Sequence, residues 1–241
     1  MSFRNLPRVP EPEVMEETGE VESYNSAAAA RHLDAIDNTF VAHLLRLLSA
    51  KPQGASIPRW GLDIGTGPAQ IPIKILGKIP GLRIVALDRS RTMLAQARRN
   101  ALDAGVADRL ILLAGDGHSL PFRDGAFSMV LCNSMLHHAR DPVTLFREMS
   151  RVAAPEAALL LRDLRRPSRL LLPLHLWRHG RHYRGLMRTL FDQSVRAAYT
   201  IDDLDVFIRQ SKLSGLSPFR FRGAHIGIER PQRQGRVTSD K

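Results

Sequence analysis

The residues best suited to bind a ligand lie in one short stretch, where an apolar run containing Asp63 passes into a glycine-rich turn at 65–69. Apolar spacing resumes over 71–76, so the pattern predicts a strand, a tight turn and a helix. Glycines suit such a turn because their backbone adopts unusual dihedral angles and leaves its N–H groups open to a ligand. The first N–H groups of the helix carry a partial positive charge, which favours an anionic or electron-rich ligand group.

Two further acids follow predicted strands. Asp88 ends the apolar run at 82–87, and Asp116 follows the run at 109–113. Open α/β sheets bind ligands at the carboxyl ends of parallel strands, and an acid there can accept hydrogen bonds from both hydroxyls of a ribose. Nicotinamide and adenosylmethionine sites share this chemistry, so Asp88 alone does not distinguish them.

The glycine turn narrows the choice of ligand. A dinucleotide turn requires G-x-G-x-x-G, but Gln70 occupies the third glycine position, and the phosphate-binding G-x-x-x-x-G-K-[ST] is absent. The pattern present, D-x-G-x-G-x-A, resembles that of the class I S-adenosylmethionine-dependent methyltransferases, whose usual form is [DE]-x-G-x-G-x-G. Ala69 departs from that form at the last glycine, which would slightly restrict the turn without closing the site.

Two more runs support the resemblance, which covers residues 60–163. L-P-F-x-D-x-x-F at 120–127 and L-H-H-x-x-D-P at 136–142 are similar to runs in the small-molecule branch close to the ubiquinone/menaquinone-type methyltransferases. The resemblance implies S-adenosylmethionine as cofactor, with Asp116 accepting a hydrogen bond from the adenine amino group. The residues that it implies hold the cofactor are Asp63, Gly65, Thr66, Gly67, Asp88, Arg89, Asp116, Gly117 and Asn133.

The same resemblance implies in-line attack of an acceptor on the sulfonium methyl, and such an enzyme works mainly by alignment. His137 and His138 would lie beside the transfer site, where either could orient the acceptor or act as a base near neutral pH. Asp163, at the carboxyl end of a strand predicted over 157–161, is a further candidate to contact the acceptor. Alternatively, one histidine hydrogen-bonds the loop and the other points to solvent.

The sequence shows no metal site, because adjacent histidines usually point in different directions. The single cysteine, Cys132, excludes an internal disulfide and a CxxC site. It lies in an apolar strand, where a free cysteine is usually a small buried hydrophobe rather than a nucleophile.

The chain is basic, with a formal net charge of +11. Residues 164–191 hold seven arginines, three histidines and no acid, among several leucines and Trp177. This insertion could grip an anionic substrate, lie on an anionic membrane surface or contact RNA phosphates; it could equally be a helical hairpin with a solvated basic face. The positive charge alone therefore leaves an RNA methyltransferase as an alternative function. However, the motif [DN]-P-P-[YF], which is typical of enzymes that methylate a nucleobase amine, is missing. A non-catalytic cofactor-binding module is a second alternative.

The length of 241 residues and the 44% hydrophobic content predict one α/β domain. By resemblance it is a Rossmann-like seven-stranded sheet, mostly parallel with a final antiparallel strand and with helices on both faces. No early apolar segment or 18-residue apolar run appears, which predicts a soluble cytoplasmic protein. We expect six segments: a flexible acidic leader without chemistry (1–23), an N-terminal cap helix (24–56), the S-adenosylmethionine-binding core (57–163), a basic insertion or acceptor lid (164–200), a helix and strand pair completing the sheet (201–229), and a flexible tail (230–241). The resemblance implies that the cap helix covers the cofactor with Tyr24 touching it, and that the insertion forms the acceptor lid; alternatively, the cap helix is purely structural.

Overall fold

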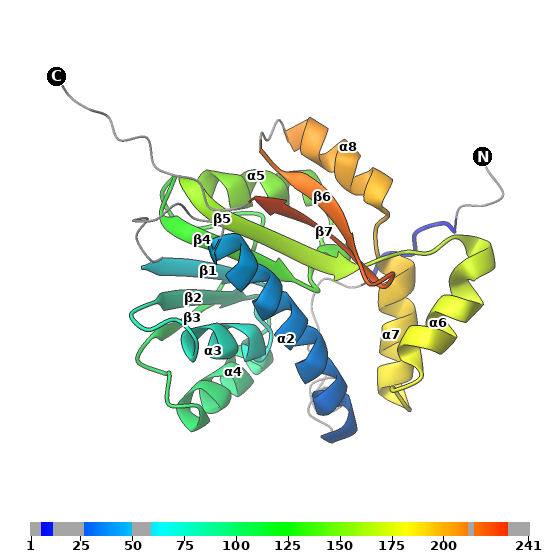
Figure 1. Cartoon of the computed structure of the whole chain (residues 1–241), viewed down its shortest axis with the longest axis horizontal. Helices are drawn as coiled ribbons and strands as arrows, with labels where there is room; N and C mark the ends of the chain where they lie inside the picture. The colour runs from blue at the N-terminus through cyan, green and yellow to red at the C-terminus, as the bar shows by residue number, and fades with distance from the viewer. Residues whose placement is uncertain (1–5, 12–26, 50–58, 212–214, 231–241) are drawn as a thin grey trace.

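The computed structural model describes residues 6–11, 27–49, 59–211 and 215–230, and within them a single seven-stranded sheet of order β3-β2-β1-β4-β5-β7-β6 (Figure 1). Strands β1 to β5 run parallel, and β7 runs antiparallel to both of its neighbours. The predicted fold is therefore confirmed, including the final strand pair. The strands are β1 (Trp60–Ile64), β2 (Arg83–Asp88), β3 (Leu110–Ala114), β4 (Phe127–Asn133), β5 (Ala153–Leu164), β6 (Ser217–Phe221) and β7 (His225–Arg230).

Helices cover both faces of the sheet because side chains alternate along each strand. In β4, Met129 and Leu131 pack in one core with α2 (Ala27–Ser49), α3 (Gln70–Leu76) and α4 (Arg91–Asp103). Their neighbours Val130 and Cys132 point the other way, into a core shared with α5 (Pro142–Val152) and α8 (Ile201–Ser211). The burial of Cys132 confirms its prediction as a small hydrophobe.

Caps fix the helices that follow the ligand-binding edge. Ser90 accepts a hydrogen bond from the backbone N–H of Met93 at the start of α4, and Asp141 accepts one from Thr144 at the start of α5. The predicted capping box of α8 is also present, since Thr200 and Asp203 bond reciprocally through side chain and backbone. Each cap satisfies N–H groups that have no partner within the helix.

The basic insertion forms a helical hairpin at the tip of β5, made of α6 (Leu172–Gly180) and α7 (Leu186–Ala197) (Figure 1). A short 3-10 turn, Arg169–Leu171, precedes it, and another, Leu136–His138, follows β4. The hairpin has a third, separate core, to which Leu6 and Leu33 also contribute; its buried members are Leu172, Tyr183, Met187, Leu190, Phe191 and Val195. In the part of the chain described, no helix has both the length and the apolar character needed to cross a membrane.

Both ends of the described chain differ from the prediction. Residues 6–11, predicted to belong to a flexible leader, lie along α7: the guanidinium of Arg8 donates to the carbonyls of Ala197 (2.6 Å) and His137 (2.7 Å) and lies 4.2 Å from the Tyr199 ring centroid. Arg230, predicted to begin the tail, ends β7, and its side chain donates to the carbonyl of Ala157. Composition did not show these contacts because each pairs residues far apart in the sequence. Tyr24 lies outside the described residues.

Candidate active site

The glycine turn between β1 and α3 requires two residues without side chains. Gly65 (φ +70°) and Gly67 (φ +53°) both adopt left-handed backbone conformations, and a Cβ on Gly65 would lie 2.4 Å from Cγ of Met135. The N–H groups of Gly65 and Thr66 donate to the carbonyl of Leu87, which fixes the turn to the end of β2. A Cβ on Gly67 would meet nothing within 4 Å, so this part of the turn faces open space.

Ala69 also adopts a left-handed conformation, with φ +61°, immediately before α3. Its methyl group is fully buried in the core under α2, α3 and α4 and does not reach the space above the turn. The alanine therefore imposes backbone strain, which in a left-handed helix amounts to roughly 1–2 kcal/mol per residue, but it does not narrow the site.

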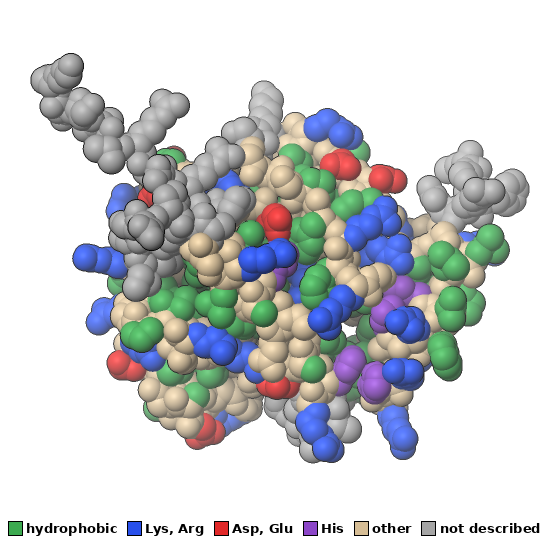
Figure 2. All heavy atoms as spheres, in the orientation of Figure 1, with side chains coloured by type: hydrophobic (Ala, Val, Ile, Leu, Met, Phe, Trp, Pro, Cys, Tyr) green, Lys and Arg blue, Asp and Glu red, His purple; other side chains and the backbone are tan. Residues whose placement is uncertain are grey.

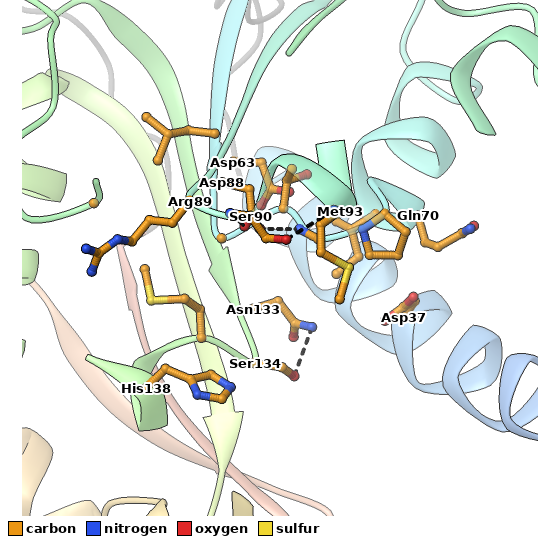
Figure 3. Close-up of a pocket in the computed structure, with 18 of the residues that line it drawn as sticks. Asp37, Asp63, Gln70, Asp88, Arg89, Ser90, Met93, Asn133, Ser134 and His138 are labelled. Atoms are coloured by element: carbon orange, nitrogen blue, oxygen red, sulfur yellow. Dashed lines mark hydrogen bonds between the residues drawn. The ribbon is translucent and has the colours of Figure 1, made fainter. Parts of the chain in front are cut away.

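A cavity of about 570 Å³ lies above the turn (Figure 3). All nine residues predicted to hold the cofactor line it, although they come from four different strand ends. Helix α2 closes one side with Arg31, Asp34 and Asp37, which the sequence interpretation missed. The only sequence signal for these three residues was the spacing of the two acids on a helix that we expected to cap the site.

The carboxylates around this cavity differ in their protonation. Burial raises the pKa of Asp63 to about 7, an effect that the neighbouring acids Asp88 and Asp37 reinforce. Burial also raises the pKa of Asp37 to about 6, against the opposing charge of Arg162. Asp116 differs: although burial acts to raise its pKa, hydrogen bonds from His118 and the nearby charge of Arg89 lower it overall. The cavity therefore offers two acids that titrate near neutral pH and one, Asp116, whose lowered pKa favours the ionised carboxylate.

Asp88 is positioned by two backbone donors. Its carboxylate accepts hydrogen bonds from the N–H of Gly67 (2.7 Å) and the N–H of Ser90 (2.9 Å). Burial raises its pKa, and these bonds offset only part of that effect. Because a carboxylate has about four acceptor positions, those two bonds leave capacity for the hydroxyls of a ligand.

Arg162, on β5, connects the cap helix to the strand ends. It is fully buried and donates to Thr39 Oγ1 (2.8 Å), to the carbonyl of Ile36 (3.0 Å) and to Asn133 Oδ1 (3.3 Å). Burial lowers its pKa to about 10, so it stays charged at neutral pH. One guanidinium thus ties α2 to Asn133 at the end of β4.

The three predicted catalytic residues occupy different positions. His138 lines the 570 Å³ cavity, whereas His137 and Asp163 do not. Asp163 is 2% exposed; its carboxylate accepts from His137 Nδ1 at 2.6 Å and from the N–H of His137 at 2.9 Å. Asp163 is not among the lining residues of this cavity and holds His137 instead, so its contact with an acceptor stays a prediction.

The two histidines do not point in different directions, as the sequence had suggested. Their ring centroids are 4.2 Å apart, and both residues lie in the 3-10 turn after β4. Glu11, from the segment predicted to do no chemistry, lies 3.7 Å from His137 Nε2 and 3.6 Å from His138 Nδ1. Two imidazole nitrogens and one carboxylate could hold a divalent metal ion, which the sequence interpretation had excluded.

The same arrangement also suits an imidazolium between two carboxylates. Burial acts to lower the pKa of His137, but the charge and hydrogen bond of Asp163, together with Glu11, raise it overall. The charged guanidinium of Arg8 lowers the pKa of His137, and the same positive charge would disfavour a metal ion beside this histidine. The raised pKa of His137 therefore favours a protonated imidazole between the two carboxylates.

A second cavity, of about 410 Å³, lies beside the first and shares Leu33, Asp37 and Ser134 with it. His137 lines it, together with apolar and aromatic groups of the hairpin. Arg178, Arg181 and Arg222 also line it, and Asp37 is the one acid among its described lining residues. Burial and neighbouring positive charges lower the pKa of His179, so arginines supply the positive charge at neutral pH.

The comparisons with known proteins agree with this geometry. Residues 62–161 match the methyltransferase domain family. The chain is 23% identical over 226 residues to the ubiquinone/menaquinone biosynthesis C-methyltransferase UbiE of Paracoccus denitrificans, covering 88% of this chain and 89% of that protein. It is also 33% identical over 107 residues to the malonyl-[acyl-carrier protein] O-methyltransferase of Legionella pneumophila, over 44% of this chain and 37% of that one.

The fold has close counterparts among solved structures. A SAM-dependent methyltransferase from Aquifex aeolicus superposes with a TM-score of 0.61 at 15% identity, covering 89% of this chain and 98% of that one. The chain is a class I S-adenosylmethionine-dependent methyltransferase. The methyltransferase's own residues fit this cofactor, because the left-handed glycine turn opens into a cavity flanked by carboxylates at two successive strand ends.

Proposed function

We propose that this methyltransferase transfers a methyl group to a small organic acceptor by direct in-line displacement. The observation that carries the proposal is the pair of adjacent cavities, which share Leu33, Asp37 and Ser134. We assign the cofactor to the first cavity and the acceptor to the second. Bound S-adenosylmethionine would supply an electrophilic methyl group on a positively charged sulfur.

The nine lining residues predicted from the sequence would hold the cofactor. Asp88 is suited to accept hydrogen bonds from ribose hydroxyls, because Gly67 and Ser90 hold its carboxylate in place. Asp116 is suited to an amino group, because its lowered pKa keeps it an acceptor. The backbone of Gly65, Thr66 and Gly67 forms the floor.

The walls of the second cavity suggest the kind of acceptor. Tyr183, Met187 and Phe191 offer an apolar and aromatic surface, and the arginines around them favour negative charge. An acceptor with an aromatic or aliphatic body and an anionic group matches both features. The UbiE and malonyl-[acyl-carrier protein] enzymes show that relatives act on non-nucleic-acid acceptors.

Alignment supplies most of the rate in such a transfer, and the chain's residues would provide it by restraining the acceptor between the hairpin and the 3-10 turn. His138 is our candidate base where the acceptor must lose a proton, since it lines the first cavity and lies against His137. Asp163 would act as a positioning residue, through His137. A cytoplasmic location stays a prediction from the sequence.

The test is a two-stage measurement. Calorimetric titration with S-adenosylmethionine and S-adenosylhomocysteine, with NADH as control, measures the first cavity alone. Release of S-adenosylhomocysteine is then followed with a panel of anionic aromatic acceptors and with a single-stranded RNA. We expect turnover with members of the panel and none with RNA. Turnover with RNA only would overturn the acceptor class, and NADH binding in place of the other two would overturn the cofactor site.

A further inference from the structure

The 3-10 turn Arg169–Leu171 and the outer side of α6 after it together carry exposed apolar side chains at helical spacing. Leu170 is 79% exposed, Leu174 57% and Trp177 61%, and Leu171 beside them is 52% exposed. Positions 170, 174 and 177 lie on one side of a helix. We call these four residues the α6 face.

The rest of the fold does not account for the α6 face. The inner side of the same segment already packs the third core, through Leu172 and Leu176. Among the described residues, ten large hydrophobic side chains are exposed, and half of them fall between Leu170 and Leu186. Single exposed apolar residues are ordinary, but a contiguous group indicates an interaction surface.

Positive charge accompanies the apolar group. Arg169 precedes the α6 face, Arg178 follows it, and Arg181 and Arg184 continue into the loop before α7; all four are exposed. Figure 2 shows hydrophobic side chains along the outer edge over α6, with Lys and Arg side chains directly beside them. The whole stretch 164–191 contains no acid that would neutralise them.

This combination selects one kind of partner. RNA would engage the arginines but leave Leu170 and Leu174 in water. In an anionic bilayer, leucines enter the acyl boundary, tryptophan lies at the headgroup level, and arginines meet the lipid phosphates. We propose that the α6 face and its flanking arginines dock this protein on an anionic membrane surface.

Docking there would have a positional consequence. The inner side of the hairpin lines the second cavity with Tyr183, Met187 and Phe191. Helix α6 itself contributes Arg178 and His179 to this cavity, and a helix is about 10 Å across. The second cavity would therefore lie next to the bilayer, whatever the reaction at the first.

Flotation with lipid vesicles tests the surface, using the full chain. The probes are vesicles of phosphatidylcholine alone and vesicles with roughly one third phosphatidylglycerol. We expect binding to the anionic vesicles, weakened by salt, and at least about tenfold weaker partitioning for the double variant Leu174→Ser, Trp177→Ser. Leu102→Ser, an equally exposed leucine on α4, is the matched control and should bind like the parent.

The charged part is tested separately with Arg169→Gln plus Arg184→Gln, which lie outside both cavities. Loss of two cations near the surface should weaken binding to anionic vesicles by about 30-fold. In a Trp60→Phe background, emission from Trp177 should shift to the blue on binding. All variants change exposed groups, so unchanged thermal melting confirms that they fold.

Three outcomes would overturn the proposal: no vesicle binding by the parent, equal binding by the Leu174→Ser, Trp177→Ser variant, or binding to pure phosphatidylcholine as strong as to anionic vesicles. Tight binding to single-stranded RNA that the leucine variant leaves unchanged, together with no vesicle binding, would assign the arginines to nucleic acid instead.

Discussion

The imidazole Nδ1 of His137 lies 2.6 Å from a carboxylate oxygen of Asp163, and both residues are at most 3% exposed. The pair joins the end of β5 to the turn after β4, across strands whose register pairs Asn133 with Arg162. A buried pair of this kind is costly to break from one side, because the remaining group keeps an uncompensated charge.

Asp163→Asn should therefore destabilise the protein by about 3 kcal/mol. For a chain of this size, such a loss corresponds to a fall in Tm of about 6–12 °C, measurable by calorimetry. Asp192→Asn, which breaks the surface pair with Arg196, is the control and should cost under about 1 kcal/mol. Equal small losses in both variants would contradict a strong buried pair.

The effect of Asp163→Asn should depend on pH. The pKa of His137 is higher in the folded protein than in the unfolded chain, where it is about 6.5. Its contribution to the free energy of unfolding is therefore complete below about pH 6.5 and is lost as the pH rises through the folded pKa. Burial acts to raise the pKa of Asp163, but the charge and hydrogen bonds of His137 outweigh burial and lower this pKa overall. The contribution of Asp163 to the free energy of unfolding is therefore present above its unfolded pKa and is lost as the pH falls through its folded pKa. The Tm difference between parent and variant should be largest near pH 5–6 and shrink towards pH 9.

Asp88→Ala tests the cofactor site. Loss of a carboxylate that bonds ribose hydroxyls and the Gly67 N–H should weaken S-adenosylmethionine binding by about 1–3 kcal/mol, or about 5- to 150-fold in Kd. Isothermal titration calorimetry measures the change directly. Asp103→Ala, an exposed acid at the end of α4, should bind like the parent. Unchanged affinity in Asp88→Ala would remove this residue from the site.

Cofactor binding should weaken as pH falls from about 7 to 5.5. Burial raises the pKa of Asp63 to about 7 and that of Asp37 to about 6, so both take up protons in this range when the cavity is free. S-adenosylmethionine carries positive charge, which favours the ionised carboxylates, so binding should release protons. We expect a loss of about threefold to tenfold per pH unit, reduced in Asp37→Asn. S-adenosylhomocysteine, without charge at sulfur, should depend less on pH.

Arg8→Ala tests the ordered N-terminal segment. The variant loses charged hydrogen bonds to the carbonyls of His137 and Ala197, and packing on Tyr199. We expect a decrease in the free energy of unfolding of about 1–3 kcal/mol, seen as a lower urea midpoint with an unchanged slope. Arg123→Ala, at an exposed site, serves for comparison. If both variants unfold at the same urea concentration, residues 6–11 contribute nothing to the fold.

The residues that line the first cavity around the glycine turn could be named from the sequence because their signals are local. The strand, glycine turn and helix occupy 60–76, and Asp88 and Asp116 each follow an apolar run directly. Parallel strands then bring these ends together whatever the details of packing. Even the strain at Ala69 could be suspected from its departure from the usual glycine.

The contacts around His137 and Asp163 depend on long-range pairing, which the sequence does not show. Asp163 was placed at a strand end correctly, but its partner, His137, depends on the register of β4 with β5. Glu11 and Arg8 reach the histidines across more than a hundred residues, from a segment whose composition suggested only flexibility. Asp37 was not singled out, because its place in the cavity depends on how α2 packs on the sheet.

The third hydrophobic core, around Tyr183 and Phe191, has a consequence for evolution and for engineering. Because the hairpin stabilises itself largely apart from the two cores of the sheet, its inward side chains can be exchanged without disturbing the glycine turn or Asp88. On the proposed assignment of the second cavity to the acceptor, new acceptor preferences can arise by drift in one short segment while the glycine turn and Asp88 are inherited intact. Grafting hairpins from relatives onto this sheet would then be a practical route to altered specificity.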